Sequence, residues 1–291
     1  MTNIGVIGLG NMGRGMARSL SRAGFTVSGF DPFLKDRSPF DGYAVEFHSS
    51  LLELLADCNV IVMSLPTSNE VEATVSGKDG LLSGDLAGKI IIDTSTSHPA
   101  VTKRLSELLG SAGAQLIDAP VSGGPAGAEN GALGMVLGGS PDAIEAAMPI
   151  LEAMSAKRTY VGKSGAGHTL KIINNALCAA NISLAAEAVR LGALFGMTPE
   201  NVIDGLNSGS GRNAATEVNF PKWVLNGAYD SGFTMKLMLK DLRLAGDLLG
   251  QTDLENTLID EVIADWNEAG RELEDTDDFN AVARFILSNQ K

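Results

Sequence analysis

A glycine-rich turn near the N-terminus restricts the fold more than any other feature of the sequence. It follows an apolar run at residues 4–7 and opens a helical pattern at residues 12–23. A GxGxxG turn in this context brings backbone amides and the positive end of a helix dipole to a pyrophosphate, although alone it could be an ordinary turn. We therefore predict a dinucleotide-binding turn made of Gly8, Leu9, Gly10, Asn11, Met12 and Gly13.

Strand and helix patterns alternate through the first half of the chain. Strands are predicted at residues 4–7, 26–30, 60–64, 90–93, 115–118, 132–138 and 158–161. Helices are predicted at residues 12–23, 50–55, 71–75, 100–112 and 143–154. This alternation predicts an α/β domain of Rossmann type, with a doubly wound, mostly parallel sheet covered on both faces.

The second half of the chain shows only helical patterns. A small-residue linker at residues 163–167 precedes a helix at residues 170–195 that is apolar nearly all the way round, which predicts a buried helix. Further helices are predicted at residues 199–206, 219–225, 235–249, 254–269 and 279–288. We predict a dinucleotide-binding domain at residues 1–163 and an all-α domain for substrate and oligomerisation at residues 164–291.

The apolar helix also bears on assembly. It carries more hydrophobic surface than one small sheet domain can cover, so we expect it to pack against another subunit. A homodimer or a homotetramer would satisfy this expectation.

Composition excludes several classes of partner. The net charge is −13 with no basic run, which argues against nucleic acid and anionic lipid. We expect no membrane segment, because no stretch reaches the roughly 18 apolar residues of a spanning helix, and the N-terminus lacks a basic leader. A cytoplasmic protein is expected. Cys58 and Cys178 lack metal-ligand spacing, so we expect two buried packing residues and no metal site.

Asp31 follows the second predicted strand at the offset where an acidic side chain accepts hydrogen bonds from ribose hydroxyls. Its charge would repel a 2′-phosphate, which favours NAD as the cofactor. Lys35 or Arg37 could still reach a phosphate, so NADP remains possible. The alternative is a carboxylate that only initiates the turn at Pro32.

Lys171 and Asn175 are four residues apart at the start of the long helix, a spacing that places both on one helical face. Burial lowers the pKa of a lysine amine toward the range useful for general acid/base work. The alternative is a lysine that reaches the surface beside asparagines that bridge helices.

A second glycine-rich segment, Asp118-Ala119-Pro120-Val121-Ser122-Gly123-Gly124, follows a predicted strand. The Ser122 hydroxyl and the backbone amides of Gly123 and Gly124 could hold a carboxylate. A plain loop is equally compatible with this segment.

Together these motifs resemble those of the 3-hydroxyisobutyrate dehydrogenase family, the β-hydroxyacid dehydrogenases, which includes tartronate semialdehyde (2-hydroxy-3-oxopropionate) reductases. The resemblance covers essentially the whole chain. It rests on the turn at residues 8–13, the segment at residues 118–124, a GxGxxxKxxNN pattern ending in Lys171, Asn174 and Asn175, and Lys240-Asp241-Leu242.

The resemblance implies further site residues. It places Leu65, Pro66 and Thr96 against the cofactor, Asn174 against the substrate, and Lys240 near both. Pro66 could instead simply end a strand, and Thr96 could cap a helix.

His168 and Arg212 are two further candidate residues. His168 stands where the family often has glutamine, and we interpret it as a neutral hydrogen-bonding substitute. Arg212 could contact a substrate tail or form a surface salt bridge.

The predicted activity is hydride transfer between NAD and the hydroxyl-bearing carbon of a small 3-hydroxy acid, such as hydroxyisobutyrate, glycerate, tartronate semialdehyde or threonate. Lys171 and Asn175 are the predicted catalytic residues. An oxidative decarboxylase of 6-phosphogluconate dehydrogenase type would need a larger helical domain. An imine reductase would generally lack Lys171, and a non-catalytic dinucleotide-binding module would not need Lys171 and Asn175.

Overall fold

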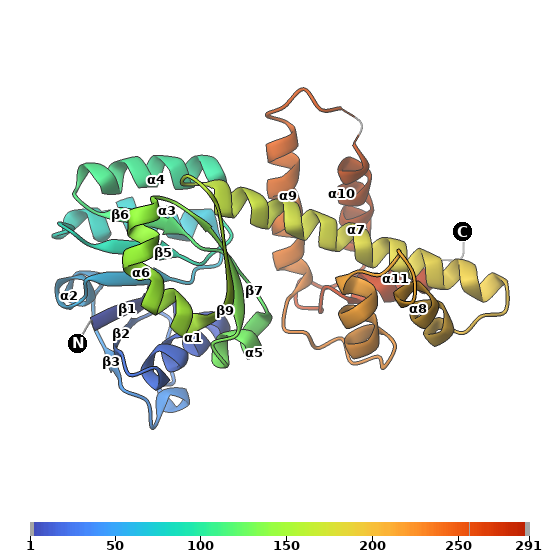
Figure 1. The fold of residues 1–291 in the computed structure, drawn as a ribbon, viewed down its shortest axis with the longest axis horizontal. Helices are drawn as coiled ribbons and strands as arrows, with labels where there is room; N and C mark the ends of the chain where they lie inside the picture. Colours follow the sequence, from blue (N-terminus) through green and yellow to red (C-terminus); the bar gives the residue numbers. More distant parts are fainter. Residues whose placement is uncertain (1–2, 256, 289–291) are drawn as a thin grey trace. The chain divides into compact units, whose positions relative to one another are not determined.

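A computed structural model describes residues 3–255 and 257–288 of the chain. The chain divides into two compact units, Met1–Lys171 and Ile172–Lys291. The division falls inside one long helix, α7, which spans Ala166–Leu194 (Figure 1).

The first unit is built on one sheet, which has nine strands within the described residues. The strands are β1 Asn3–Ile7, β2 Thr26–Phe30, β3 Val45–Phe47, β4 Val60–Met63, β5 Ile90–Asp93, β6 Gln115–Asp118, β7 Val121–Ser122, β8 Leu133–Gly138 and β9 Ser155–Gly162. Their order is β3-β2-β1-β4-β5-β6-β8-β7, with β9 paired to β8. The strand order reverses between β1 and β4, and in such sheets ligands bind beyond the carboxyl ends of the strands at this point.

Most strand pairs in the sheet are parallel, as the alternating pattern predicts. The exceptions are the pairs that β8 makes with β6 and β7, which are antiparallel. The expected Rossmann-type unit is therefore confirmed, with an antiparallel element added after β6.

Helices cover both faces of this sheet. One face carries α1 Asn11–Arg22, α5 Gly124–Glu129 and α6 Pro141–Met154, and the other carries α2 Leu51–Asp57, α3 Ser68–Ser76 and α4 Pro99–Ser111. Side-chain caps start α2, α3 and α4: Ser50, Thr67 and His98 each accept a hydrogen bond from a backbone amide of the first turn. The two hydrophobic cores hold the sheet between the two helical layers.

The second unit is helical. It contains the rest of α7, then α8 Pro199–Asn207, a π-helical segment Ala215–Val224, α9 Met235–Leu249, α10 Leu258–Ala269 and α11 Ala281–Ser288. Its core is built around the fully buried rings of Trp266 and Phe220. The predicted all-α character is confirmed, and only an isolated bridge between Thr234 and Asp278 adds β pairing among the described residues.

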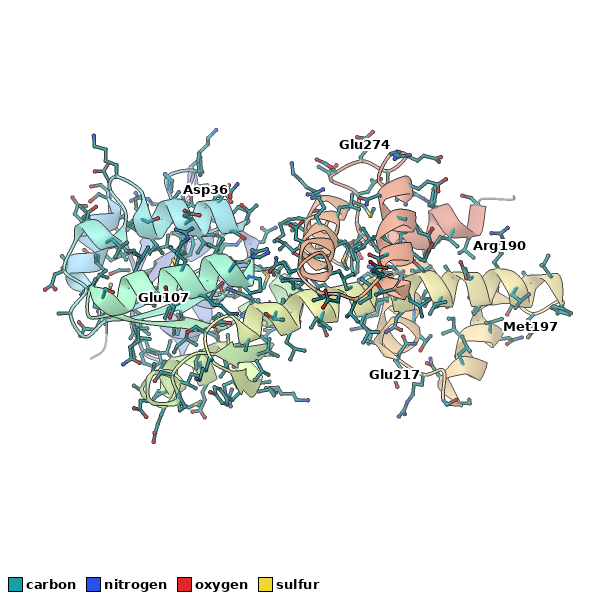
Figure 2. The ribbon with its side chains drawn as sticks, turned by 90° about the horizontal axis from the view of Figure 1, so that it is seen from above. Asp36, Glu107, Arg190, Met197, Glu217 and Glu274 are labelled. Carbon is teal, nitrogen blue, oxygen red and sulfur yellow. The ribbon has the colours of Figure 1, made fainter. Side chains whose placement is uncertain are left out.

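The prediction of a buried helix at residues 170–195 is only partly correct, because one face of α7 is exposed. One face, with Ile172, Ala179 and Ile182, lies in the core, whereas Leu184 on the other face is 63% exposed. The helix is also long and apolar enough to cross a membrane by length and composition, so the expectation that no stretch reaches that threshold is wrong. Core helices of other proteins pass the same test. Figure 2 shows Arg190 and Met197 toward the C-terminal end of this helix.

Cys58 is buried as expected, and burial raises the pKa of its thiol. Cys178 is only partly buried, which corrects the second half of that prediction.

Candidate functional site

The glycine turn has the geometry that a pyrophosphate site requires. Gly8 has a φ of 84°, and a Cβ there would lie 2.3 Å from the Ser64 carbonyl oxygen. A Cβ at Gly13 would lie 1.8 Å from the carbonyl oxygen of Gly8, so only glycine allows α1 to start this close to the turn. A Cβ at Gly10 would meet nothing within 4 Å. The middle glycine thus leaves open space beside the first turn of α1.

Asp31 lies just beyond β2 and is tied to this turn. Its Oδ2 accepts a hydrogen bond from the Leu9 amide at 2.8 Å, and its Oδ1 accepts one from the Phe33 amide at 2.8 Å. The carboxylate therefore stands beside the glycine turn, as the sequence offset predicts. Arg37 stacks over the Phe47 ring at 4.7 Å.

The loops after β4 and β5 adjoin the turn. A Cβ at Gly8 would lie 3.1 Å from Cδ2 of Leu65, and the Leu65 amide donates to the Ser95 hydroxyl at 3.0 Å. Pro66 and Thr96 follow in these two loops. Thr96 does not cap α4, because His98 does so through Nδ1.

Lys171 and Ser122 meet in the first unit. The Lys171 Nζ donates a hydrogen bond to the Ser122 Oγ at 3.2 Å. Gly123 and Gly124 follow Ser122 with φ values of 121° and 63°, so this turn needs glycine for its backbone conformation. A cation, a hydroxyl and a glycine turn at one place suit an anionic ligand.

The first turn of α7 is held by residues to which the sequence analysis gave no role. The buried Asp118 carboxylate accepts hydrogen bonds from the amides of Gly165 and His168. The His168 ring is fully buried, with Nδ1 2.7 Å from the Thr102 hydroxyl, so this turn lies beside the N-terminal end of α4 (Figure 1). His168 Nε2 lies 3.8 Å from a carboxylate oxygen of Asp93.

A second polar cluster lies in the helical unit. Asn175 is buried and its Nδ2 donates to Oδ2 of Asp241 at 2.6 Å, while Asn174 donates to Oδ1 of Asn175 at 3.2 Å. Lys240 pairs with the other Asp241 oxygen at 3.0 Å. The structure thus joins Asn174, Asn175 and Lys240 through Asp241, a residue that sequence reasoning quoted without assigning it a role.

Arg212 forms an ion pair within the helical unit. Its side chain is 63% exposed and lies 3.6 Å from Glu217, which is the surface ion pair offered as its alternative.

The first unit therefore fits a dinucleotide. The open space at Gly10 and the helix start beside it suit a pyrophosphate, and the anchored carboxylate of Asp31 suits ribose hydroxyls.

Comparison with known proteins agrees with this geometry. Residues 3–162 match the family described as the NAD binding domain of 6-phosphogluconate dehydrogenase. Residues 165–286 match the family described as NAD-binding of NADP-dependent 3-hydroxyisobutyrate dehydrogenase. A probable mitochondrial 3-hydroxyisobutyrate dehydrogenase of Arabidopsis thaliana is 34% identical, over 99% of this chain and 88% of its own. This chain belongs to the 3-hydroxyisobutyrate dehydrogenase family.

Other members of the 3-hydroxyisobutyrate dehydrogenase family extend the comparison. The 2-(hydroxymethyl)glutarate dehydrogenase of Eubacterium barkeri is 36% identical over 83% of this chain and 80% of its own. The structure of Mycobacterium tuberculosis 3-hydroxyisobutyrate dehydrogenase with L-serine has a TM-score of 0.90 at 31% identity, covering 98% of this chain and 99% of that one. The predicted family, fold and class, an NAD-linked hydroxy-acid oxidoreductase for which NADP is possible, are confirmed.

Proposed function

We propose that Lys171 is the general acid/base for hydride transfer at the hydroxyl-bearing carbon of a small 3-hydroxy acid. The observation that carries this proposal is the 3.2 Å contact between the Lys171 amine and the Ser122 hydroxyl. It places an amine next to the turn that is suited to a carboxylate, in the same unit as the dinucleotide turn.

In the proposed reaction the turn at residues 8–13 binds the cofactor and the turn at residues 122–124 binds the substrate. The substrate carboxylate binds the Ser122 hydroxyl and the amides of Gly123 and Gly124, which leaves the substrate hydroxyl facing Lys171. When bound, the nicotinamide ring supplies the hydride acceptor or donor. The neutral Lys171 amine takes the hydroxyl proton as the carbon loses its hydride. In the reverse direction the protonated amine returns that proton and stabilises the forming alkoxide.

Asn175, Asn174 and Lys240 are proposed to assist from the helical unit. The carboxylate of Asp241 fixes the orientation of the Asn175 amide, so Asn175 is presented in one rotamer. Asn175 follows Lys171 by four residues on α7, the spacing at which helical side chains share a face.

Substitution of the lysine tests this assignment. In Lys171→Met the side chain keeps its length and loses its amine, so turnover should fall by about 10²–10⁴-fold while NADH affinity stays close to that of the native enzyme. NADH oxidation at its absorbance band measures turnover, and fluorescence titration measures binding. Lys157→Ala, at an exposed position on β9, is the matched control and should keep full activity. Normal turnover in Lys171→Met would remove the assignment.

The substrate class is proposed from the family relatives. An NAD-dependent L-serine dehydrogenase of Pseudomonas aeruginosa is 36% identical over 84% of this chain, and L-serine is itself a 3-hydroxy acid. We propose a substrate among 3-hydroxyisobutyrate, glycerate, threonate and L-serine. A panel of these acids, run with NAD and with NADP, identifies it.

A homo-oligomer through the exposed face of α7 is also proposed. Leu177, Leu184 and Leu191 recur every seven residues and are 59%, 63% and 59% exposed. Such a repeat forms an apolar seam that a second copy of the chain can cover. Light scattering after chromatography should show a smaller species for Leu184→Glu, whereas an unchanged mass would contradict this interface.

A further inference from the structure

Asp118 is a buried acid to which the proposed chemistry assigns no role. It ends β6 and is fully buried. Its Oδ1 accepts a hydrogen bond from the Gly165 amide at 2.9 Å, and its Oδ2 accepts one from the His168 amide at 3.1 Å. Amides at a helix start have no partner within the helix. The start of α7 is therefore capped by a carboxylate from a distant strand.

Two glycines enclose this carboxylate. A Cβ at Gly138 on β8 would lie 2.5 Å from Oδ2 and 2.7 Å from Oδ1 of Asp118. A Cβ at Gly167 would lie 2.9 Å from Oδ2 and 2.6 Å from the Asp118 carbonyl oxygen. Since all four distances are shorter than real Cβ contacts, any larger residue at either position would displace the carboxylate or the helix start. The site has room for one carboxylate in one position.

The same carboxylate is connected to both partners of the proposed reaction by short stretches of chain, to Ser122 directly and to Lys171 through the His168 amide that it accepts from. Lys171 follows His168 by three residues on α7, and Ser122 follows Asp118 by four residues. The Lys171 amine reaches the Ser122 hydroxyl at 3.2 Å. A displacement of the α7 start from the end of β6 would therefore change that distance directly.

We propose that Asp118 is a positioning residue for this reaction: by holding the amides of Gly165 and His168 it sets the Lys171 amine beside Ser122. The proposal rests on the role proposed for Lys171. Asp118 is fully buried and both of its oxygens accept hydrogen bonds from backbone amides, so the proposal gives it no contact with substrate or cofactor. It acts through the backbone at the start of α7.

Asp118→Asn is the first test, because it keeps the shape of the side chain and places an NH₂ group against one of the two backbone amides. Two donors then face each other, and the helix start must shift. A misplacement near 1 Å can cost about 100-fold in rate, so kcat should fall by about 10–100-fold. NADH affinity should not change, because the residues that contact Asp118 lie outside the cofactor turn at residues 8–13. The pH profile of kcat should also move, because Lys171 loses its fixed neighbour.

A pair of variants separates positioning from packing. Asp118→Ala opens a cavity, and adding Gly138→Ala to it returns a methyl group to the vacated space. The double variant should recover part of the Tm lost in Asp118→Ala while kcat stays low. Gly138→Ala alone keeps the carboxylate but displaces it, so it should lower kcat as Asp118→Asn does, even if the Asp118 variants fail to fold. Val75→Ala, a core truncation on α3, is the stability control and should lower Tm without lowering kcat.

The outcomes are distinct. Native kcat and pH profile in folded Asp118→Asn, or in Gly138→Ala where the Asp118 variants do not fold, would overturn the positioning role. Recovery of kcat together with Tm in the double variant would also overturn it, because packing alone would then explain the loss. Retained turnover in Lys171→Met would instead overturn the function proposed for Lys171, whatever the Asp118 variants show.

Discussion

The two glycine-rich turns of the first unit need glycine for different physical reasons. At residues 8–13 the outer glycines are required by space, because a Cβ would collide with the backbone, and Gly8 also by its positive φ of 84°, while the middle one faces open space. At Gly123 the nearest atom to a Cβ is 3.5 Å away, so space is adequate, and the requirement is the positive φ of 121°. A substitution at an outer glycine of residues 8–13 must therefore move neighbouring backbone and destabilise the fold. A substitution at Gly123 strains the local backbone and leaves the residues packed around the turn in place.

Gly13→Ala should have the largest effect, because its methyl group would lie 1.8 Å from the Gly8 carbonyl oxygen. We expect a loss of about 3 kcal/mol in the free energy of unfolding, together with weaker NADH binding. Urea denaturation and NADH titration measure the two effects. If Gly13→Ala kept native stability, the backbone at residues 8–13 would be able to move and accommodate the methyl group. The two turns would then not differ in their requirement for space.

Gly10→Ala should separate binding from stability within the same turn. Nothing lies within 4 Å of its Cβ, so stability should be unchanged, while the methyl group occupies the space proposed for the pyrophosphate. NADH affinity should fall about tenfold, which corresponds to about 1.4 kcal/mol. Gly110→Ala, at an equally open position in α4, should bind NADH normally. Equal NADH affinity in both variants would place the pyrophosphate elsewhere.

Gly123→Ala should act on the substrate alone. Its positive φ costs an alanine about 1 kcal/mol, and relaxation of that strain would move the amides proposed to hold the carboxylate. The KM for the hydroxy acid should rise and NADH affinity should stay the same. Gly24→Ala carries similar strain, at a φ of 88° in the turn after α1, and should leave KM unchanged. A raised KM in both variants would contradict a local effect.

Glu129→Gln should have the smallest effect, and it tests the link between the turns. Glu129 ends α5 and pairs with Arg18 and Arg22 of α1, each at 2.9 Å. Partial burial opposes ionisation of Glu129, but hydrogen bonds and charge from the two arginines outweigh it and lower the pKa.

Because the folded pKa lies below the unfolded one, this carboxylate stabilises the fold above the unfolded value of about 4.3, and the contribution disappears as the pH falls through the folded pKa. Its side chain is about a third exposed, so we expect a loss of up to about 1 kcal/mol at pH 7. Unfolding of both proteins at pH 7 and pH 3 measures it. A penalty that persists at pH 3 would show that charge is not its cause.

Elements with strong periodicity could be predicted closely. The strands at Ile90–Asp93 and Gln115–Asp118 and the helix at Met235–Leu249 have the bounds expected from their patterns. The sequence analysis did not predict β3 and β7, because two or three residues are too few to show alternation. It also missed α5, since a segment reading Gly-Pro-Ala-Gly-Ala-Glu has low helix propensity and is held instead by packing against α1.

The residues of the candidate site also differed in how well the sequence predicted them. The glycine turn and Asp31 are close in sequence and carry a local signal, so both could be located before the structure was known. The contacts of Asp118 are 47 and 50 residues away, and the Asp241 partner of Asn175 is 66 residues away. Such pairings arise only from the tertiary fold. Which face of α7 is exposed could not be predicted, because apolar residues on all sides of a helix do not distinguish a core face from an exposed one.

The two hydrogen bonds of Asp31 restrict how cofactor preference could be redesigned. Each carboxylate oxygen accepts a hydrogen bond from a backbone amide, one from Leu9 in the glycine turn and one from Phe33 after β2. Replacing Asp31 with a neutral residue to admit a 2′-phosphate would also release the clamp that joins these two segments. An NADP-using variant is therefore better sought by keeping this acid and replacing the exposed Asp36, between Lys35 and Arg37, with a basic residue.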